Sequence, residues 1–291
     1  MRTLFPMVAG AALLLGGCLN GTDSSTELGL AARAEQRYEF AEAINHYKQS
    51  AERGNAEAQN RLGVIYDQGL DYVPKDQVEA ARFFKLAAAQ GEAWAEFNLG
   101  LYYAGGKGGL PMDDREAARL FKLSADQGNL HGQVSLGAFY ADGRGGLPKD
   151  DREAVRLYRL ADAQDELQAK VDLGIFYETG RGGLPIDREQ AAVFYCHAVV
   201  LGNPNAEFNL GRVYATGMGG FPKDDRLAAS FFNLAANHGH VPAQIALAAL
   251  LKAHPGALDI TPRQKMELVN QSHDACVTVE QRIAQRSLSS P

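Results

Sequence analysis

Histidine, aspartate and glycine are the residues of this sequence whose types and spacing could do chemistry. The seven histidines are scattered without the spacing of metal ligands, so we expect no metal site. Aspartate pairs such as Asp113-Asp114 could act as catalytic carboxylates, and glycine pairs such as Gly108-Gly109 could bind phosphate through their amides. Both kinds of pair recur along the chain, which favours structural roles as helix caps and turns. Without a nucleophile elbow or a Ser/His/Asp arrangement, we expect no catalytic residue, no cofactor, no small-molecule substrate and no enzyme activity.

Cys18 predicts a different chemistry, that of a lipid anchor. It follows a segment in which Arg2 is the only charged residue and whose apolar stretch, residues 4–15, is too short to span a bilayer. The sequence LGGC at residues 15–18 resembles the lipobox of bacterial lipoproteins. This resemblance implies that residues 1–17 are a signal peptide and that Cys18 becomes the acylated first residue. An ordinary signal peptide with an incidental cysteine is the alternative.

The residues after Cys18 bear on where the protein resides. In lipoproteins of this kind, an aspartate directly after the acylated cysteine keeps the protein out of the outer membrane. This sequence has Leu19 at that position, which implies transfer to the outer membrane. We therefore expect an outer-membrane lipoprotein that faces the periplasm. Residues 18–26 would form the lipidated cysteine and a polar linker of at most about 25 Å, which keeps the folded part close to the membrane.

Self-comparison of the chain shows a repeat of 37 residues. Leu-Gly pairs mark it at Leu62-Gly63, Leu99-Gly100, Leu136-Gly137, Leu173-Gly174 and Leu210-Gly211. The same interval separates a set of tyrosines, namely Tyr66, Tyr103, Tyr140, Tyr177 and Tyr214. Prolines follow the same register at Pro74, Pro111, Pro148, Pro185 and Pro222. Chance does not produce several parallel series of this kind.

Each repeat predicts two helices. In the first helix of one repeat, Ala95, Leu99 and Tyr102 recur at helical spacing and mark a buried face. Gly106 then ends the helix, because glycine adopts the left-handed conformation without a steric penalty.

The loop after each first helix predicts how the second helix begins. It carries a proline and then an aspartate suited to cap the helix. After Asp113 and Asp150, a glutamate three residues later makes a capping-box-like pair. The second helix usually ends at a glycine, but Asp165 replaces that glycine in one repeat, so we expect a strained or rerouted turn there.

The combination of Leu-Gly-x-x-Tyr, a Gly-x-x-x-Pro-x-Asp loop and an alanine-rich second helix resembles the Sel1-like repeat family, relatives of the tetratricopeptide repeat. The resemblance implies an all-α fold, a right-handed α-solenoid superhelix of helix-turn-helix repeats. We place the solenoid at residues 27–254, with five full units at about 55–239 and degenerate units at both ends. Residues 255–291 are expected to form a C-terminal capping helix, to about Ile283, and a frayed tail.

Cys196 and Cys276 could form a disulfide in an oxidising periplasm. Neighbouring helices are about 10 Å apart, whereas a disulfide requires α-carbons within roughly 7 Å. The two cysteines would have a whole unit between them, so the bond needs a terminal helix that folds back along the solenoid. Cys196 also takes a place held by Lys85, Lys122 and Arg159 in other units, which predicts exposure.

Positions that vary from repeat to repeat are free of packing duty and can face a partner protein. The family geometry would place two such rows of the first helices on the concave side. The first row is Glu57, Trp94, His131, Gln168 and Asn205, and the second is Arg61, Asn98, Ser135, Asp172 and Asn209. A third row adds Leu101, Ala138, Ile175 and Arg212. Trp94 is the only tryptophan, a residue type enriched at interface hot spots, although it could also only cover a neighbouring helix.

Charge narrows the choice of partner, and three functions remain. Lys and Arg total 29 against 35 Asp and Glu, without a basic run, so nucleic acid is not an expected partner. The first hypothesis is an envelope scaffold or adaptor that binds another protein. The second is an immunity protein that neutralises a secreted antibacterial effector such as a phospholipase. A cell-wall or antibiotic hydrolase is third, and it lacks the paired cysteines typical of the family members linked to such compounds.

Overall fold

The computed structural model describes residues 26–37, 39–70, 73–199, 202–259 and 261–289. The expected signal peptide, Cys18 and most of the polar linker lie outside these residues. The chain divides into two compact units, described separately below. The first unit comprises Met1–Leu136 with Gly143–Leu147, and the second comprises Gly137–Asp142 with Pro148–Pro291.

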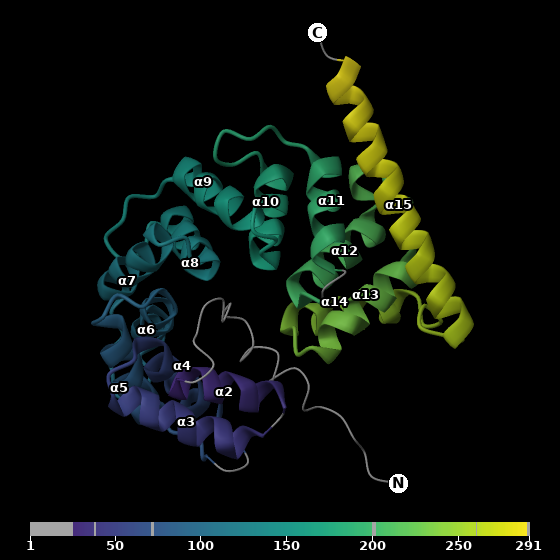
Figure 1. The fold of residues 1–291 in the computed structure, drawn as a ribbon. Coiled ribbons are helices and arrows are strands. Elements are labelled where there is room, and N and C mark those ends of the chain that lie inside the picture. The colour runs from purple at the N-terminus through teal and green to yellow at the C-terminus, as the bar shows by residue number, and fades with distance from the viewer. Residues whose placement is uncertain (1–25, 38, 71–72, 200–201, 260, 290–291) are drawn as a thin grey trace. The chain divides into compact units, whose positions relative to one another are not determined.

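The described residues are almost entirely helical (Figure 1), as the all-α expectation requires. The first unit contains α2 (Glu27–Gln36), α3 (Phe40–Glu52), α4 (Ala56–Gln68), α5 (Gln77–Ala88), α6 (Ala93–Gly105) and α7 (Asp114–Asp126). Helix α8 (Leu130–Asp142) contains the boundary between the units. The second unit continues with α9 (Asp151–Asp162), α10 (Leu167–Thr179), α11 (Arg188–Val199), α12 (Pro204–Thr216), the short 3-10 helix η1 (Met218–Gly220), α13 (Asp225–Asn237), α14 (Val241–Ala253) and α15 (Pro262–Ser289).

Each Leu-Gly pair lies where the two helices of a repeat touch. In α10, a β-carbon added at Gly174 would come within 2.5 Å of the Tyr195 ring on α11. The glycine therefore lets the two helices approach, and the ring covers its backbone. The same arrangement joins Gly63 to Phe84, Gly100 to Phe121, Gly137 to Tyr158 and Gly211 to Phe232.

The loop aspartates cap the second helices, as expected. Asp113 Oδ1 accepts hydrogen bonds from the backbone N–H groups of Arg115 at 2.9 Å and Glu116 at 3.1 Å. The capping-box expectation is wrong, because the Glu116 carboxylate pairs with Arg119 at 2.6 Å. The N–H of Asp113 donates instead to the carbonyl oxygen of Tyr103 at 2.9 Å. The same backbone hydrogen bond recurs from Asp76, Asp150, Asp187 and Asp224 to Tyr66, Tyr140, Tyr177 and Tyr214. The backbone of each repeated tyrosine therefore also fixes where the loop after it ends.

The turn at Asp165 is strained, which confirms the expectation from its missing glycine. Its φ is +61°, and among the described residues it is the one non-glycine with a positive φ. For an L-residue this conformation costs about 1–2 kcal/mol.

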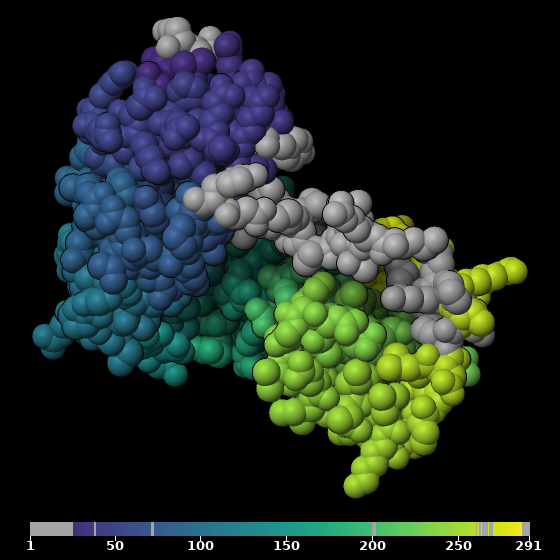
Figure 2. All heavy atoms as spheres, turned by 90° about the horizontal axis from the view of Figure 1, so that it is seen from below, coloured from purple at the N-terminus to yellow at the C-terminus, as the bar shows by residue number. Residues whose placement is uncertain are grey.

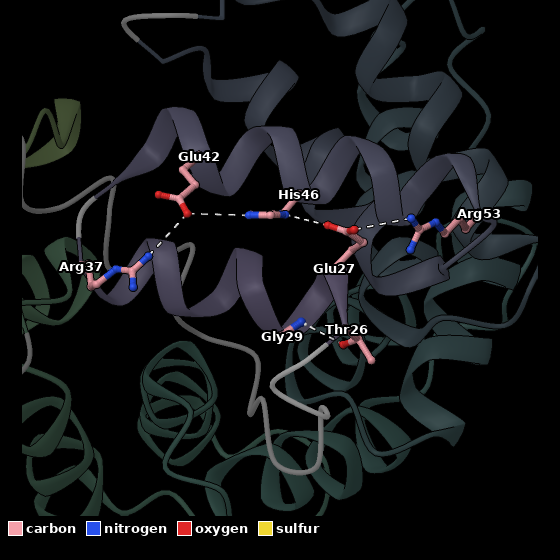
Figure 3. Close-up of polar contacts among 7 residues, drawn as sticks. All are labelled: Thr26, Glu27, Gly29, Arg37, Glu42, His46 and Arg53. Atoms are coloured by element: carbon pink, nitrogen blue, oxygen red, sulfur yellow. Dashed lines mark hydrogen bonds and ion pairs between the residues drawn. The ribbon is translucent and has the colours of Figure 1, made fainter.

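At the start of the described chain, a series of polar contacts fastens α2 to α3 (Figure 3). Thr26 caps α2 by accepting a hydrogen bond from the Gly29 N–H at 3.1 Å. Glu27 contacts His46 Nδ1 at 2.6 Å and Arg53 Nη2 at 3.5 Å, so α3 is held along its length. These exposed and half-buried pairs orient the two helices and contribute little stability each.

Helix α15 folds back across the second unit, where it packs against α11 and α13. It brings Cys276 to Cys196 with a Cα–Cα distance of 6.2 Å, and the two sulfurs are bonded. The sequence left open whether the two cysteines are bonded, which would require the terminal helix to fold back along the solenoid. The structure has the bond and the returning helix. The expectation that Cys196 is exposed is wrong, because its side chain is 5% exposed within the core that α15 helps to close. The helix also continues to Ser289, beyond the expected end at Ile283.

Candidate partner-binding surfaces

Three aromatic rings gather on α6 and α8 in the first unit, and we call Trp94, Phe97 and His131 the aromatic surface. The ring centroids of Trp94 and His131 are 5.0 Å apart in an edge-to-face arrangement. Phe97 stacks on His131 at 5.4 Å. All three side chains are half-buried, so each keeps an open part while the others hold it in place. Burial lowers the pKa of His131, so the imidazole is neutral at pH 7. The surface is therefore aromatic and uncharged, and its rings are held by contacts with each other.

The other residues predicted in this unit differ in how much surface they offer. Leu101 is 40% exposed, and Ser135 is half-buried. Asn98 donates its amide to Asn60 Oδ1 at 3.0 Å. These three can extend a contact area that begins at Trp94.

Arg61 is only 7% exposed, so it has little surface to offer a partner. Its charge acts on the buried Glu35, whose carboxyl pKa is raised by burial and lowered by Arg61. Arg61 thus occupies a repeat position whose residue type varies, but its side chain points toward the inside of its unit and not toward a partner.

In the second unit, side chains on α10 and α12 form a polar surface. We define it as Gln168, Asp172, Asn205 and Arg212, which the sequence singled out; the fifth predicted residue, Asn209, is only 6% exposed and lies beneath it. Asn205 donates to Gln168 Oε1 at 3.1 Å, and Gln168 donates to Asp172 Oδ1 at 3.2 Å. Arg212 donates to Asn209 Oδ1 at 3.1 Å. The structure therefore brings these five residues into two hydrogen-bonded groups.

His240, at the start of α14, gives the first group its direction. The backbone N–H of Ala243 donates to His240 Nδ1 at 3.1 Å, so this nitrogen carries no proton. The proton of the neutral ring is then on Nε2, which donates to Asn205 Oδ1 at 3.1 Å. Donors therefore run in one direction along the chain and end at the carboxyl of Asp172.

Asp172 is the titratable group at the end of this chain. Burial raises the pKa of its carboxyl to about 7, while the hydrogen bond from Gln168 acts in the opposite direction. The nearby negative charges of Glu166 and Asp142 raise it further. Asp172 therefore changes near neutral pH from a neutral group that can donate a hydrogen bond to a carboxylate that only accepts.

Sequence reasoning missed three participants. Glu178 holds Arg212 through an ion pair of 2.8 Å and accepts a hydrogen bond from the Tyr195 hydroxyl at 2.9 Å. The sequence did hold a signal for Glu178, because its repeat position varies among Asp67, Ala104, Ala141 and Ala215. Phe97 gave no such signal because its repeat position has the pattern of a core residue. His240 gave none because its place in the sequence is that of a helix cap.

Two features bear on other chemistries. Within the described residues, no three His, Cys, Asp or Glu side chains are grouped closely enough to hold a metal ion. In the same residues, no helix has the length and apolar character that crossing a membrane requires.

Comparison with known proteins identifies the repeat. The Sel1 repeat model matches six segments, residues 37–55, 56–92, 95–129, 130–164, 167–198 and 204–240. No curated protein matches the chain. A Sel1 repeat protein from Oxalobacter formigenes is 27% identical with a TM-score of 0.69, over 85% of this chain and 97% of that one.

Two further solved structures are similar to parts of the chain. The protective antigen c5321 of uropathogenic Escherichia coli is 27% identical with a TM-score of 0.60, over 91% of this chain and 56% of that one. This chain therefore spans little more than half the length of the antigen. The immunity protein Pa5087 of Pseudomonas aeruginosa is 18% identical with a TM-score of 0.45, over 84% and 86% of the two chains. At that level of similarity, the likeness carries no argument about function.

Proposed function

The chain belongs to the Sel1 repeat family, whose repeats form a protein-interaction fold, and from this premise we propose that it binds another protein through its variable repeat positions. The partner would contact the aromatic surface, the polar surface or both. The single observation that carries this proposal is the difference between fixed and variable positions. Gly100 and Gly174 do the same packing work in their repeats, whereas Trp94 and Gln168 share one repeat position and have unrelated chemistry.

The two surfaces would contribute to binding in different ways. Trp94 offers a large ring already held by His131 and Phe97, so little side-chain entropy is lost when a partner covers it. Asp172 and Arg212 offer directional contacts, and their orientations are set by Gln168 and Glu178. Aromatic and arginine side chains of this kind are the usual hot spots of protein interfaces.

We further propose that the protein is a lipoprotein of the outer membrane, facing the periplasm, that holds an envelope assembly as a scaffold or adaptor. Support comes from the LGGC sequence at residues 15–18 and from Leu19. The bonded pair Cys196–Cys276 fits an oxidising compartment. Labelling cells with a radioactive fatty acid tests the anchor, because Cys18→Ser should abolish the labelling. Leu19→Asp should move the labelled protein from the outer to the inner membrane fraction, and an unchanged distribution would contradict the proposed address.

The partner itself can be sought by purifying the acylated protein from membranes and identifying what co-elutes. Trp94→Ala combined with Asp172→Ala should reduce the co-eluting protein and leave the helical circular dichroism unchanged. Leu160→Ala is the matched control, because Leu160 is 43% exposed and lies on a second helix, α9. Equal co-elution with all three proteins would mean that the partner binds elsewhere. A secreted toxin as the partner would indicate an immunity role in place of scaffolding.

A further inference from the structure

Helix α14 (Val241–Ala253) is a first helix for which the described residues contain no second helix of the same repeat. In the five repeats before it, each first helix packs against the second helix of its own repeat, as α12 packs against α13 and as Gly137 of α8 meets the Tyr158 ring of α9. After α14 the chain leads into α15, which packs against α11 and α13. Among the described residues, no helix therefore pairs with α14 as α13 pairs with α12.

The face left open is the one that a second helix covers elsewhere. Leu247-Ala248 continues the register of the Leu-Gly pairs, and Ala248 takes the place of Gly211, which lies beneath the Phe232 ring. Ala248 is exposed. Ile245 takes the place of Phe208, whose ring centroid is 5.8 Å from that of Phe232, and Ile245 is 67% exposed.

The open face is apolar over the first two turns of the helix. Val241, four residues before Ile245, is 59% exposed, so Val241, Ile245 and Ala248 form one stripe on α14. In Figure 2 the yellow-green segment that includes α14 lies at the surface of the face shown. An apolar stripe of this kind on a protein surface is typical of an interaction site.

We propose that this stripe docks an amphipathic helix of another protein, in the place of the missing second helix. The established interfaces of the chain indicate the chemistry of that helix. Each second helix buries an alanine, an aromatic residue four positions later and a small residue three positions after that. These sets are Ala80/Phe84/Ala87, Ala117/Phe121/Ser124, Ala154/Tyr158/Ala161, Ala191/Tyr195/Ala198 and Ala228/Phe232/Ala235. The docked helix should carry the same set, with its aromatic ring over Ala248.

Charge favours the orientation of that helix. Second helices run antiparallel to first helices, so their first turns lie near the last turn of the first helix. Those first turns are acidic, as at Glu79, Glu116 and Asp225. Lys252 is the basic residue in the last turn of α14 and is exposed, so it would meet an acidic first turn of the docked helix.

A second copy of this chain does not supply the required ring from its own C-terminal helices. Neither α14 nor α15 contains Phe, Tyr or Trp. In the second helices, the aromatic residues that follow an alanine by four positions are buried in their own repeats, as Phe121 and Phe232 are at 1% and 4% exposure. The occupant is therefore a helix of a different protein that presents an alanine and an aromatic residue on one face.

The test uses the full chain and a fluorescent peptide with the sequence of α13, residues 225–237, as a substitute for the partner helix. Fluorescence anisotropy should show saturable binding. Phe232→Ala in the peptide and Ile245→Glu in the chain should each weaken it by about ten-fold or more, equivalent to about 1.4 kcal/mol. Val78→Glu is the control, because Val78 is 65% exposed and lies on α5, away from the α14 stripe in sequence. Circular dichroism checks that each variant is folded.

A second variant places the ring more sharply. At Gly211 a β-carbon would come within 2.6 Å of the Phe232 ring, so Ala248 should hold a docked ring farther away than glycine does. Ala248→Gly should therefore tighten peptide binding, although glycine lowers helix propensity. Equal binding of the Phe232→Ala peptide, or no effect of Ile245→Glu, would overturn the proposal. A dimer that Ile245→Glu dissociates would overturn it too, because a second copy would then occupy the stripe. Trp94→Ala should leave peptide binding unchanged, which separates this proposal from the function proposed above.

Discussion

The aromatic surface of the first unit and the polar surface of the second unit share most of their repeat positions. Trp94 and Gln168 are equivalent, as are Asn98 and Asp172. In one unit the rings stack on each other, and in the other the side chains form a directed series of hydrogen bonds. The framework beneath both is the same, with a glycine under an aromatic ring and an aspartate bonded to a tyrosine carbonyl. A repeat fold thus fixes the backbone and leaves the surface chemistry to vary.

The two surfaces also respond to pH in opposite directions. Burial raises the pKa of Asp172 and lowers the pKa of His131, and in both cases the neutral form is favoured. The contribution of Asp172 to stability is fully present below pH 3.8, the ordinary value, and is lost as pH rises toward 7. For His131, stability is present above pH 6.5, the ordinary value, and is lost as pH falls below it.

The largest effect on stability is expected at Asp172. Asp172→Asn removes a carboxylate that is ionised and half-buried above pH 7, so the variant should be more stable than the parent at pH 8. The gain should be on the order of a few kcal/mol at most, because one pKa unit corresponds to about 1.4 kcal/mol. It should shrink as pH falls from 7 to 4 in urea unfolding experiments. A difference that does not vary with pH would contradict the buried titration.

The next largest effect is expected in partner binding. Trp94→Ala should weaken binding of the co-purified partner by about 2 kcal/mol, roughly 30-fold, because the ring is large and already ordered. Arg212→Ala should cost about 1 kcal/mol or less, since the Arg212 side chain is 42% exposed and its pair with Glu178 is partly solvated. Isothermal titration calorimetry distinguishes the two. The reverse order would show that the polar surface dominates recognition.

A smaller effect, opposite in sign to that of Asp172, is expected at His131. His131→Gln should reduce the loss of stability between pH 7 and pH 5, because the ring no longer has to be protonated in a partly buried site. Unfolding of parent and variant at the two pH values measures this difference. If the parent loses no more stability than the variant between pH 7 and pH 5, His131 is protonated without cost and its ring is accessible to water.

The smallest effect is expected at Asp165, in the turn before the polar surface. Asp165→Gly should stabilise the protein by about 0.5–1 kcal/mol, because glycine adopts a φ of +61° without strain. The ion pair with Lys170 contributes little, since the Asp165 side chain is 92% exposed. Thermal unfolding should show a higher midpoint, and partner binding should not change. A lower midpoint would mean that the Asp165 side chain stabilises the turn.

The sequence predicted the repeat well because its signals are local and recur. Helix caps such as Asp113, and the strained turn at Asp165, follow from residues within a few positions of each other. The Sel1 family and the all-α solenoid were confirmed for the same reason. The return of α15 was one of two alternatives that the cysteines left open, and the sequence could not decide between them, because the residues after α14 leave the repeat register and nothing local indicates where that helix packs.

The sequence predicted which residues belong to the candidate surfaces, but it did not predict which of them interact. Variation among repeats selected Gln168, Asp172 and Asn205, but their hydrogen-bond direction depends on His240, whose proton position follows from the cap of α14. Arg61 shows the opposite case, because its position varies and yet its side chain is buried. Exposure depends on side-chain conformation and on neighbours distant in sequence, which a single repeat position does not contain.

The bond between Cys196 and Cys276 changes how the second unit can come apart. Tandem repeats lose structure from their free ends, one repeat after another. Here the covalent link spans 80 residues and encloses α12, α13 and α14, so the final segments cannot peel away while α11 stays folded. Mechanical pulling on the C-terminus should therefore be resisted until the α11 region yields, and a reducing agent should restore stepwise fraying. We propose that the protein is tethered to the membrane at its N-terminus. The disulfide then makes the C-terminal part, which lies farthest along the chain from the anchor, the part that best withstands mechanical load.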